Sequence, residues 1–301
     1  MQKLTQKGVT MRFSTNSYPS QNSLPHTRIQ VRTSNAIKNL FCNVFSLQKS
    51  LFFCALFLSL LFQGCKDSNL TMATAAEFRP FEYVESSEIK GIDIDIAKEI
   101  AKRLDKKLEI KNMKFDSVIS TVNSGVADIA ISSITINSVR EKIIDFSTPY
   151  YEASQMVIVK NNDSRFVNIS SKEELLDKIN SIKGLKIAVA VSTTGSSYVM
   201  GDKELGFSGF DNATPKAYTN STLALKALIY NQADIMIIDE MPATMLTRIN
   251  PTTSLLPFRL TEEHYGIAIN KQKPKLKKSI QKALDEMKND GTLEAIISKY
   301  L

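Results

Sequence analysis

The amino-acid sequence predicts an α/β fold with a largely parallel sheet. From Leu70 onward, short apolar runs typical of buried strands alternate with segments whose apolar residues recur at helical spacing, which is the pattern of βαβ units. A second observation is an internal echo: "GVADIAISS" and "NQADIMIIDE" both place Ala-Asp-Ile after a helix and before an apolar strand with a polar tip. The echo supports two related halves.

In the first half, the clearest element is a helix in which Ile92, Ile96 and Ile100 recur at helical spacing. Asp93 and Asp95 lie in its first turn, where carboxylates complement the helix dipole. The spacing of a serine and a glutamate in "NSVREKIID" (138 and 141) is that of a capping box. In chain order we predict a strand over 70–76, this helix to 104, a strand over 107–113, a helix over 115–125, a strand over 127–132 and a helical turn over 137–145.

The second half repeats the alternation. Ser171 and Glu174 have the spacing of another capping box, and the long helix near the end of the sequence stops at Asp290-Gly291. In chain order we predict a helix over 170–180, a strand over 185–191, a polar loop over 192–197, a helix over 220–232, a strand over 233–239, a strand over 264–270 and helices over 274–291 and 292–301.

Charge and composition exclude several classes of function. Seven of the 38 basic residues and none of the 31 acidic ones precede residue 65, so the chain beyond it is formally neutral and carries no footprint for nucleic acid. The three cysteines are all at or before Cys65, and there are only two histidines. We therefore expect no disulfide, no metal centre and no cofactor in the folded part.

Residues 1–64 are predicted to be a leader with a signal peptide. A lysine precedes an apolar stretch of about twelve residues (51–62), which is shorter than the roughly 20 residues that span a bilayer. Gly64-Cys65 follows it and resembles a lipoprotein box, so Cys65 is the candidate for lipidation and residues 65–69 for the linker to the anchor. The alternatives are a plain cleaved signal, a start codon assigned too early and an organelle transit peptide.

Polar residues cluster after three of the predicted strands, where ligands bind in open α/β sheets. In "ADIAISSITINSVR", Ser133, Thr135 and Arg140 could form a carboxylate cradle, because arginine offers a rigid bidentate fork. "VSTTGSS" adds backbone N–H groups near Thr194 and Gly195. The alternative for both stretches is ordinary turns and helix caps.

Asp239 ends a third apolar strand, where a carboxylate is either a helix cap or the partner of a cation. Together with Arg140 it outlines a zwitterion, with a carboxylate at the arginine and an ammonium at the aspartate. Phe78 and Phe115 follow two other strands and could sandwich an aliphatic side chain, although a core position is the alternative; Phe81 is predicted to be core.

Three stretches resemble the polar amino-acid-binding proteins of ABC importers, solute-binding protein family 3. They are "ATAAEFRPFEYVESSEIKGIDIDIAKEI", "ADIAISSITINSVREKIIDFSTPYY" and "DGTLEAIISKY", and the likeness covers residues 70–301. It implies the type II periplasmic binding protein fold, in which two lobes are joined by two hinge strands and close on a free amino acid. By motif position, lobe 1 is 70–150 with 267–301, lobe 2 is 155–262, and the hinges lie near 150–154 and 263–266.

The resemblance also assigns roles to the residues at the strand tips. Phe78 and Phe115 match the stacking aromatics. Ser133, Thr135, Arg140, Thr194 and Gly195 match the α-carboxylate site, and Ser133 and Asp239 the α-ammonium site. Three positions depart from common family residues: Ala75 where many members carry an acid, Val191 where glutamine binders carry a lysine, and Arg79 in place of a proline. Glu77 either faces the pocket and favours a basic or amide side chain, or lies on its rim.

The function expected from this resemblance is that of the extracytoplasmic solute-binding subunit of an importer, held at the outer face of the membrane. It would work with a permease and an ATPase. We expect a monomer that binds its ligand and catalyses no reaction. One alternative is a cyclohexadienyl or arogenate dehydratase on the same fold, with Glu77 or Glu240 as the general acid. Another is an amino-acid sensor subunit.

Overall fold

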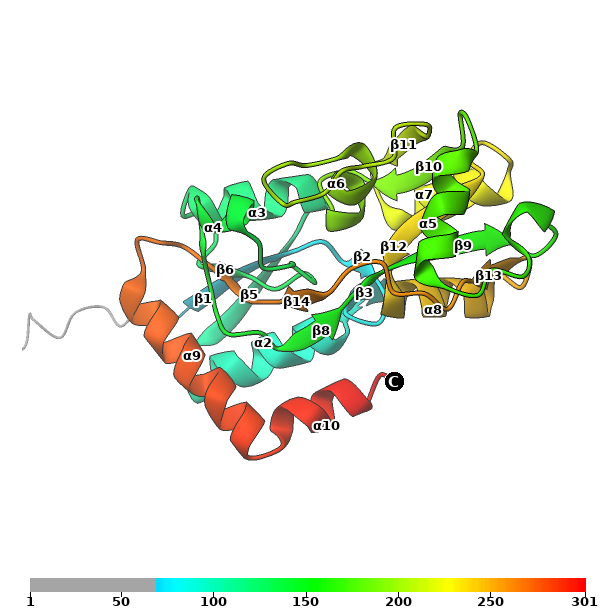
Figure 1. Cartoon of the computed structure of the whole chain (residues 1–301). Coiled ribbons are helices and arrows are strands. Elements are labelled where there is room, and N and C mark those ends of the chain that lie inside the picture. The colour runs from blue at the N-terminus through cyan, green and yellow to red at the C-terminus, as the bar shows by residue number, and fades with distance from the viewer. Residues whose placement is uncertain (1–68) are drawn as a thin grey trace, which may run out of the picture. The chain divides into compact units, whose positions relative to one another are not determined.

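A computed structural model of the chain describes residues 69–301, which belong to one compact unit. The predicted leader, its apolar stretch and Cys65 lie outside the described residues. Within 69–301, two five-stranded sheets each form the centre of a lobe, and a two-stranded connection runs between them (Figure 1). No helix among these residues combines the length and the apolar composition needed to cross a bilayer.

Lobe 1 is built on a sheet in which β1 pairs in parallel with β5 on one side and β6 on the other, while β15 returns antiparallel. Neighbouring residues of β1 face opposite layers: Met72 packs with helices α2, α9 and α10, and Ala73 packs with α3. The elements are β1 (Asn69–Thr74), α2 (Ile92–Arg103), β5 (Lys107–Asn112), α3 (Phe115–Asn123), β6 (Ile129–Ala130), α4 (Ser138–Glu141), β7 (Asp145–Phe146), β15 (Ala268–Ile269), α9 (Pro274–Asn289) and α10 (Thr292–Ser298).

Lobe 2 repeats this arrangement, with β10 parallel to β11 and β12, and β9 antiparallel to β12 and β13. Helices α5 and α6 cover one face of the sheet, and α7 and α8 cover the other. The elements are β9 (Gln155–Lys160), the 3-10 turn η1 (Ser164–Phe166), α5 (Lys172–Ser181), β10 (Lys186–Ala190), α6 (Thr194–Met200), β11 (Thr214–Tyr218), α7 (Ser221–Ile229), β12 (Ile235–Asp239), α8 (Glu240–Ile249) and β13 (Thr253–Leu255).

Two hinge strands connect the lobes: β8 (Tyr151–Ala153) and β14 (Glu263–Tyr265) pair antiparallel. Tyr265 is fully buried, and its ring lies 5.3 Å from Phe81 and 5.8 Å from Tyr151, centroid to centroid. As predicted, Phe81 is a core residue. This aromatic cluster anchors both crossing strands to lobe 1.

A three-stranded hairpin sheet, β2 (Glu77–Phe78), β3 (Glu82–Glu85) and β4 (Glu88–Lys90), follows β1 and carries acidic residues to the cleft. Gly91 joins it to α2 with φ 129°, and a Cβ there would lie 2.1 Å from the carbonyl oxygen of Phe81. Only glycine tolerates this backbone conformation and this approach.

Three local predictions are wrong. The cap of α4 is Asn137, whose Oδ1 accepts from the Arg140 N–H, so the Ser138–Glu141 capping box does not form. The predicted loop over 192–197 is mostly helix, because Thr193 caps α6 and the helix begins at Thr194. The predicted strand over 264–270 is two strands, β14 and β15, separated by Gly266 and Ile267.

The second predicted capping box is half formed. Ser171 caps α5 and accepts from the Glu174 N–H at 3.1 Å, although the Glu174 carboxylate turns to Ser170 rather than to the cap residue.

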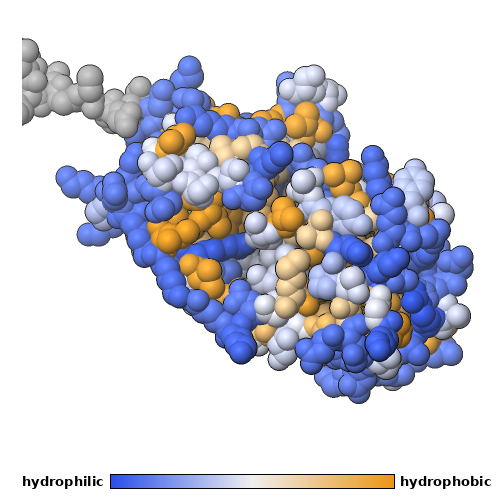
Figure 2. All heavy atoms as spheres, turned by 90° about the horizontal axis from the view of Figure 1, so that it is seen from above, coloured by the Kyte–Doolittle hydropathy of each residue, from blue (hydrophilic) through white to orange (hydrophobic). Residues whose placement is uncertain are grey.

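Over the face shown in Figure 2, hydrophilic side chains form most of the rim, and hydrophobic ones are seen mainly in its hollowed middle.

Candidate functional site

A cavity of about 750 Å³, counted with its open mouth, lies between the lobes at the carboxyl ends of their strands. This is the place where open α/β sheets bind ligands. Residues from both lobes line it: Ala75, Glu77, Phe78, Glu82, Met113, Lys114, Phe115, Ser132, Ser133, Thr135 and Arg140 from lobe 1, and Ala190, Val191, Thr193, Thr194, Thr219, Asn220, Ser221 and Asp239 from lobe 2.

Arg140 supplies a buried cation at one side of the cavity. The short helix α4 positions it, and its guanidinium donates to the carbonyl oxygens of Thr135 at 2.8 Å and of Ser192, across the cleft, at 3.2 Å. Burial lowers the pKa of Arg140 to about 10, and the carboxylates of Glu263 and Asp239 partly oppose this. The side chain therefore stays charged at neutral pH, with N–H groups left for an anion.

A chain of hydroxyl groups runs from lobe 2 to the hinge beside Arg140. The Thr194 hydroxyl lies 3.0 Å from the Thr135 hydroxyl, which donates to Glu263 Oε2 at 2.8 Å. Thr261 donates to the other oxygen of Glu263 at 2.6 Å. Glu263 thus holds Thr135 toward the hinge strand β14, and this chain links lobe 1, lobe 2 and the hinge.

Asp239 supplies the buried anion. It occupies the residue before α8, yet its side chain makes no capping hydrogen bond; instead Oδ1 accepts from the Tyr265 hydroxyl at 2.6 Å. Burial, and then the nearby charge of Glu263, raise its pKa to about 7. A carboxylate in this state gains from a cationic partner, because an ammonium group offsets the charge that burial disfavours. Of the two sequence interpretations, the cation partner fits this geometry.

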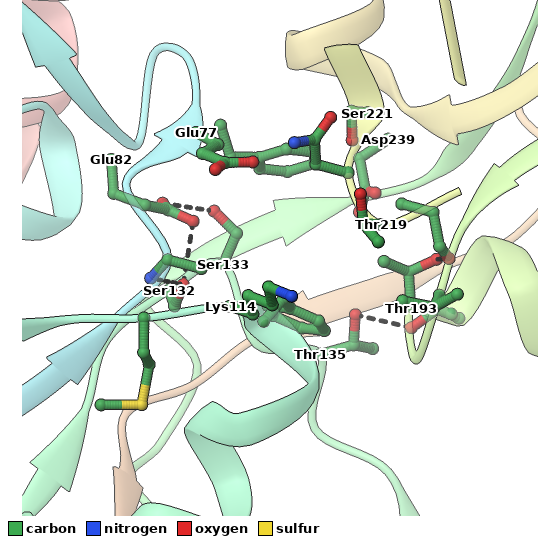
Figure 3. A pocket seen from close by; sticks show the side chains of 18 of the residues that line it. Glu77, Glu82, Lys114, Ser132, Ser133, Thr135, Thr193, Thr219, Ser221 and Asp239 are labelled. Atoms are coloured by element: carbon green, nitrogen blue, oxygen red, sulfur yellow. Dashed lines mark hydrogen bonds between the residues drawn. The ribbon is translucent and has the colours of Figure 1, made fainter. Parts of the chain in front are cut away.

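A second acidic group lies on the opposite side of the cavity. Figure 3 shows Glu77 and Glu82 there with Ser132 and Ser133, and Asp239 and Ser221 across from them. Glu77 is exposed, whereas Glu82 is 1% exposed and accepts from both serine hydroxyls. Ser133 has a left-handed backbone, with φ 49°, and its N–H donates to Asp93.

The aromatic residues form apolar parts of the wall between these two polar ends. Phe78 and Phe115 both line the cavity and are half-buried. The Arg140 guanidinium lies 5.7 Å from the centroid of the Phe115 ring, which is within the range of a cation–π contact. The walls therefore suit an aliphatic chain with a polar group at each end.

Eight of the nine ligand-binding residues predicted from the sequence line this one cavity. Gly195 does not: it lies one residue into α6, where a Cβ would be 2.7 Å from Gln155 Oε1. The sequence reasoning missed Glu82 and Lys114, and the polar segment 219–221 after β11. Asn220, which accepts from the Leu223 N–H as the cap of α7, was a readable signal for that segment.

Nothing among residues 69–301 groups three or more side chains that could hold a metal ion. The site instead offers one buried cation, several buried carboxylates and apolar walls. This arrangement suits a small ligand that carries both signs of charge.

The comparison with known proteins agrees with this geometry. Residues 70–301 match the bacterial extracellular solute-binding proteins, family 3. The chain belongs to this family. A relative in Neisseria gonorrhoeae, described as a probable histidine-binding protein, is 32% identical over 234 residues, which cover 76% of this chain and 81% of the relative.

Solved structures of similar proteins have the same two-lobe fold. An ancestral arginine-binding protein bound to arginine is 33% identical, with a TM-score of 0.67, and covers 78% of this chain and 98% of its own. An ancestral amino acid-binding protein described as a precursor of cyclohexadienyl dehydratase is 28% identical, with a TM-score of 0.67, and covers 78% and 96%. The predicted type II periplasmic binding protein fold, with two hinge strands, is confirmed.

Proposed function

We propose that this member of family 3 is the extracytoplasmic solute-binding subunit of an ABC importer, which binds a free amino acid and delivers it to a permease. The observation that carries the proposal is the pair of buried opposite charges, Arg140 and Asp239, in one cavity between the lobes. The family and the histidine- and arginine-binding relatives support the ligand class, a polar or basic amino acid.

In this proposal, the two charges hold the two groups that all amino acids share. Arg140 receives the α-carboxylate as a bidentate fork, with Thr194 adding a contact from lobe 2. Asp239 receives the α-ammonium. Ser133, which the resemblance also assigns to the α-ammonium, lies beside Glu82 on the opposite side of the cavity, and its hydroxyl donates to that carboxylate.

The two lobes then act as a hinge. Because the ligand contacts both lobes, its binding energy favours the closed conformation, which a permease recognises. The lobe boundaries that we propose are 70–150 with 267–301 and 155–262, with hinges near 150–154 and 263–266. Strand β8 lies within the first hinge segment and strand β14 within the second, and the two strands pair.

The leader gives the proposed location. A signal peptide over residues 1–64 would direct export, and a lipid at Cys65 would hold the protein at the outer face of the membrane. The Cys65→Ser variant should then move from the membrane fraction to the soluble fraction and lose labelling by a radioactive fatty acid. An unchanged distribution would indicate a plain cleaved signal.

The dehydratase alternative rests on the buried carboxyl of Glu82 and on one structural neighbour, the dehydratase precursor. Of the two acids that the sequence suggested for this reaction, Glu77 is exposed at the cavity, and Glu240 pairs with Arg259 at 2.7 Å and does not line the cavity. Release of phenylpyruvate from prephenate by the purified protein, abolished in Glu82→Gln, would support this second function.

The test of the main proposal is a thermal-shift screen of residues 66–301 against the twenty amino acids, after unfolding and refolding to remove any carried-over ligand. A ligand that binds only the folded state raises the melting temperature. At least one amino acid should do so, and Arg140→Ala should remove the shift. If none of the twenty amino acids shifts the protein, the proposal fails.

A further inference from the structure

Glu82 combines two properties that rarely occur together: it is almost completely buried, and it lines the ligand cavity. Strand β3 places it at the end of the cavity opposite Asp239 (Figure 3). The Ser132 and Ser133 hydroxyls donate to its two carboxylate oxygens, each at 3.0 Å. The carboxylate is therefore fixed in position before any ligand arrives.

A second buried carboxyl, Asp93, lies behind Glu82. Asp93 belongs to the first turn of α2, where we expected it to complement the helix dipole, but it also accepts from the Ser133 N–H at 2.7 Å and the Tyr150 hydroxyl at 2.9 Å. Burial raises the pKa of Asp93 to about 6, and burial with the charge of Asp93 raises that of Glu82 well above its ordinary range. Two adjacent buried carboxyls favour holding one proton between them.

We propose that Glu82 receives the cationic end of the ligand's side chain, so that the amino acid is a basic one, and that the ligand displaces the proton of the Glu82–Asp93 pair. This inference rests on the proposed function, because it takes the α-groups to lie at Arg140 and Asp239. The side chain then extends along the walls formed by Phe78 and Phe115 toward Glu82.

Charge balance supports a cationic ligand. Three carboxylates (Glu77, Glu82 and Asp239) and two cations (Lys114 and Arg140) line the cavity. A zwitterion brings no net charge to replace the proton that Glu82 shares with Asp93, whereas an amino acid with one further positive charge does. Arginine and lysine carry such a charge at neutral pH.

Burial makes Glu82 a stronger partner than Glu77. Glu77 is exposed, so water screens its attraction for a cation, whereas the same attraction is several times larger where water is excluded. The two serine hydroxyls also remove the need to order the Glu82 side chain on binding. Glu77 then serves at the entrance, where its substitution has a smaller effect.

The proton transfer is simple to balance. In the free protein one proton is shared by Glu82 and Asp93; when the ligand cation arrives, that proton passes to the solvent and no covalent bond to the ligand changes. The other titratable groups facing the pair are Tyr150, which precedes β8, and at the cavity Glu77 and Lys114. Affinity for a basic amino acid should therefore fall as the pH drops, because the proton and the ligand compete for the same carboxylate.

The experiment is isothermal titration of residues 66–301, which contain both sheets and all the apolar clusters described above, with arginine and with citrulline. Citrulline has nearly the shape of arginine without its charge. We expect arginine to bind at least 10-fold more tightly than citrulline. Titrations in phosphate and in Tris at pH 7 should report more proton release with arginine than with citrulline, because Asp239, with a pKa of about 7, loses the same fraction of a proton on binding the ammonium of either ligand. The same comparison with lysine covers the shorter cation.

Two matched variants locate the effect. Glu82→Gln should reduce the preference for arginine over citrulline at least 10-fold and lower the proton release with arginine to that with citrulline, whereas Glu77→Gln should change the preference less than 3-fold. Citrulline binding by Glu82→Gln shows that its site is folded; if that variant does not fold, the buffer comparison on the unsubstituted protein still decides. Citrulline or glutamine binding as tightly as arginine, or arginine binding with no more proton release than citrulline, would overturn the inference and leave the proposed function standing. Failure of all twenty amino acids would instead overturn the proposed function.

Discussion

Arg140 carries a buried positive charge that no carboxylate directly neutralises among the described residues. Its guanidinium donates to two carbonyl oxygens, one in each lobe, and burial lowers its pKa. A buried guanidinium in this state costs folding free energy that a packed apolar side chain would not. We interpret that cost as the consequence of keeping a carboxylate site ready in the absence of ligand.

Arg140→Ala should therefore weaken amino-acid binding by about 2–4 kcal/mol, which is roughly 30- to 1000-fold, because the ligand carboxylate loses its charged, bidentate partner. The melting temperature of the free protein should change little. Arg140→Lys should recover part of the affinity, because a lysine restores the charge without the fork. Titration calorimetry measures these effects, and an unchanged affinity in Arg140→Ala would show that the carboxylate binds elsewhere.

Asp239 makes the stability of the free protein depend on pH. Its pKa is about 7 in the folded protein and near 4 in an unfolded chain, so the folded state binds more protons between these values. The free energy of unfolding should thus fall as the pH rises from 5 to 8, on the order of 2 kcal/mol from this group, and Asp93 acts in the same direction. Asp239→Asn should flatten the dependence of the melting temperature on pH; a profile as steep as that of the unsubstituted protein would assign it to other groups.

Residue types at strand tips were enough to predict most of the cavity, but not Glu82. Arg140 and Asp239 follow apolar strands, so their position is readable from the sequence. Glu82 lies in a short hairpin after Phe81, and its burial depends on serines 50 and 51 residues further along the chain. These long-range contacts depend on how β3 packs against the loop after β6. The local pattern of residue types does not predict that packing.

At the scale of the elements, the long helices and the central strands were predictable because periodicity is strong over many residues. Short elements were not: four-residue α4 and two-residue β7 replace the helical turn predicted over 137–145. The side chain of Asn137 outcompetes Ser138 as the cap because it precedes the first helical residue and reaches the Arg140 N–H at 2.9 Å. A shift of one residue at this cap decides the direction of the arginine that follows.

Asn137→Ala should lower the free energy of unfolding by about 1 kcal/mol, through loss of the cap. It should also weaken ligand binding, because the cap bonds to the backbone of the binding residue itself. Ser138→Ala is the matched control and should change neither quantity by more than about 0.5 kcal/mol. Chemical denaturation and titration of both variants test this; equal effects at the two positions would mean that the cap does not position Arg140.

At the scale of the whole molecule, three polar contacts among the described residues join the lobes across the cleft without any ligand. Arg140 donates to the Ser192 carbonyl, Thr194 meets Thr135, and Lys142 of lobe 1 pairs with Glu204 of lobe 2. The first two lie in the cavity, so a bound ligand either replaces these hydrogen bonds or adds its own to the same groups. The ion pair lies outside it and acts only on the closed arrangement of the lobes.

This outer pair gives a measure of closure that is separate from ligand contacts. Both side chains are largely exposed, at 62% and 44%, so the pair should contribute less than about 1 kcal/mol and weaken in salt. Glu204→Ala should raise the dissociation constant roughly two-fold at low ionic strength and leave it unchanged at high salt, and adding Lys142→Ala should have no further effect. Glu286→Ala, which removes an exposed carboxylate that pairs with Lys282 and Arg103 within lobe 1, is the control and should leave the affinity as it is. A loss of affinity in Glu204→Ala that persists at high salt would mean that Glu204 acts on the ligand site rather than on closure.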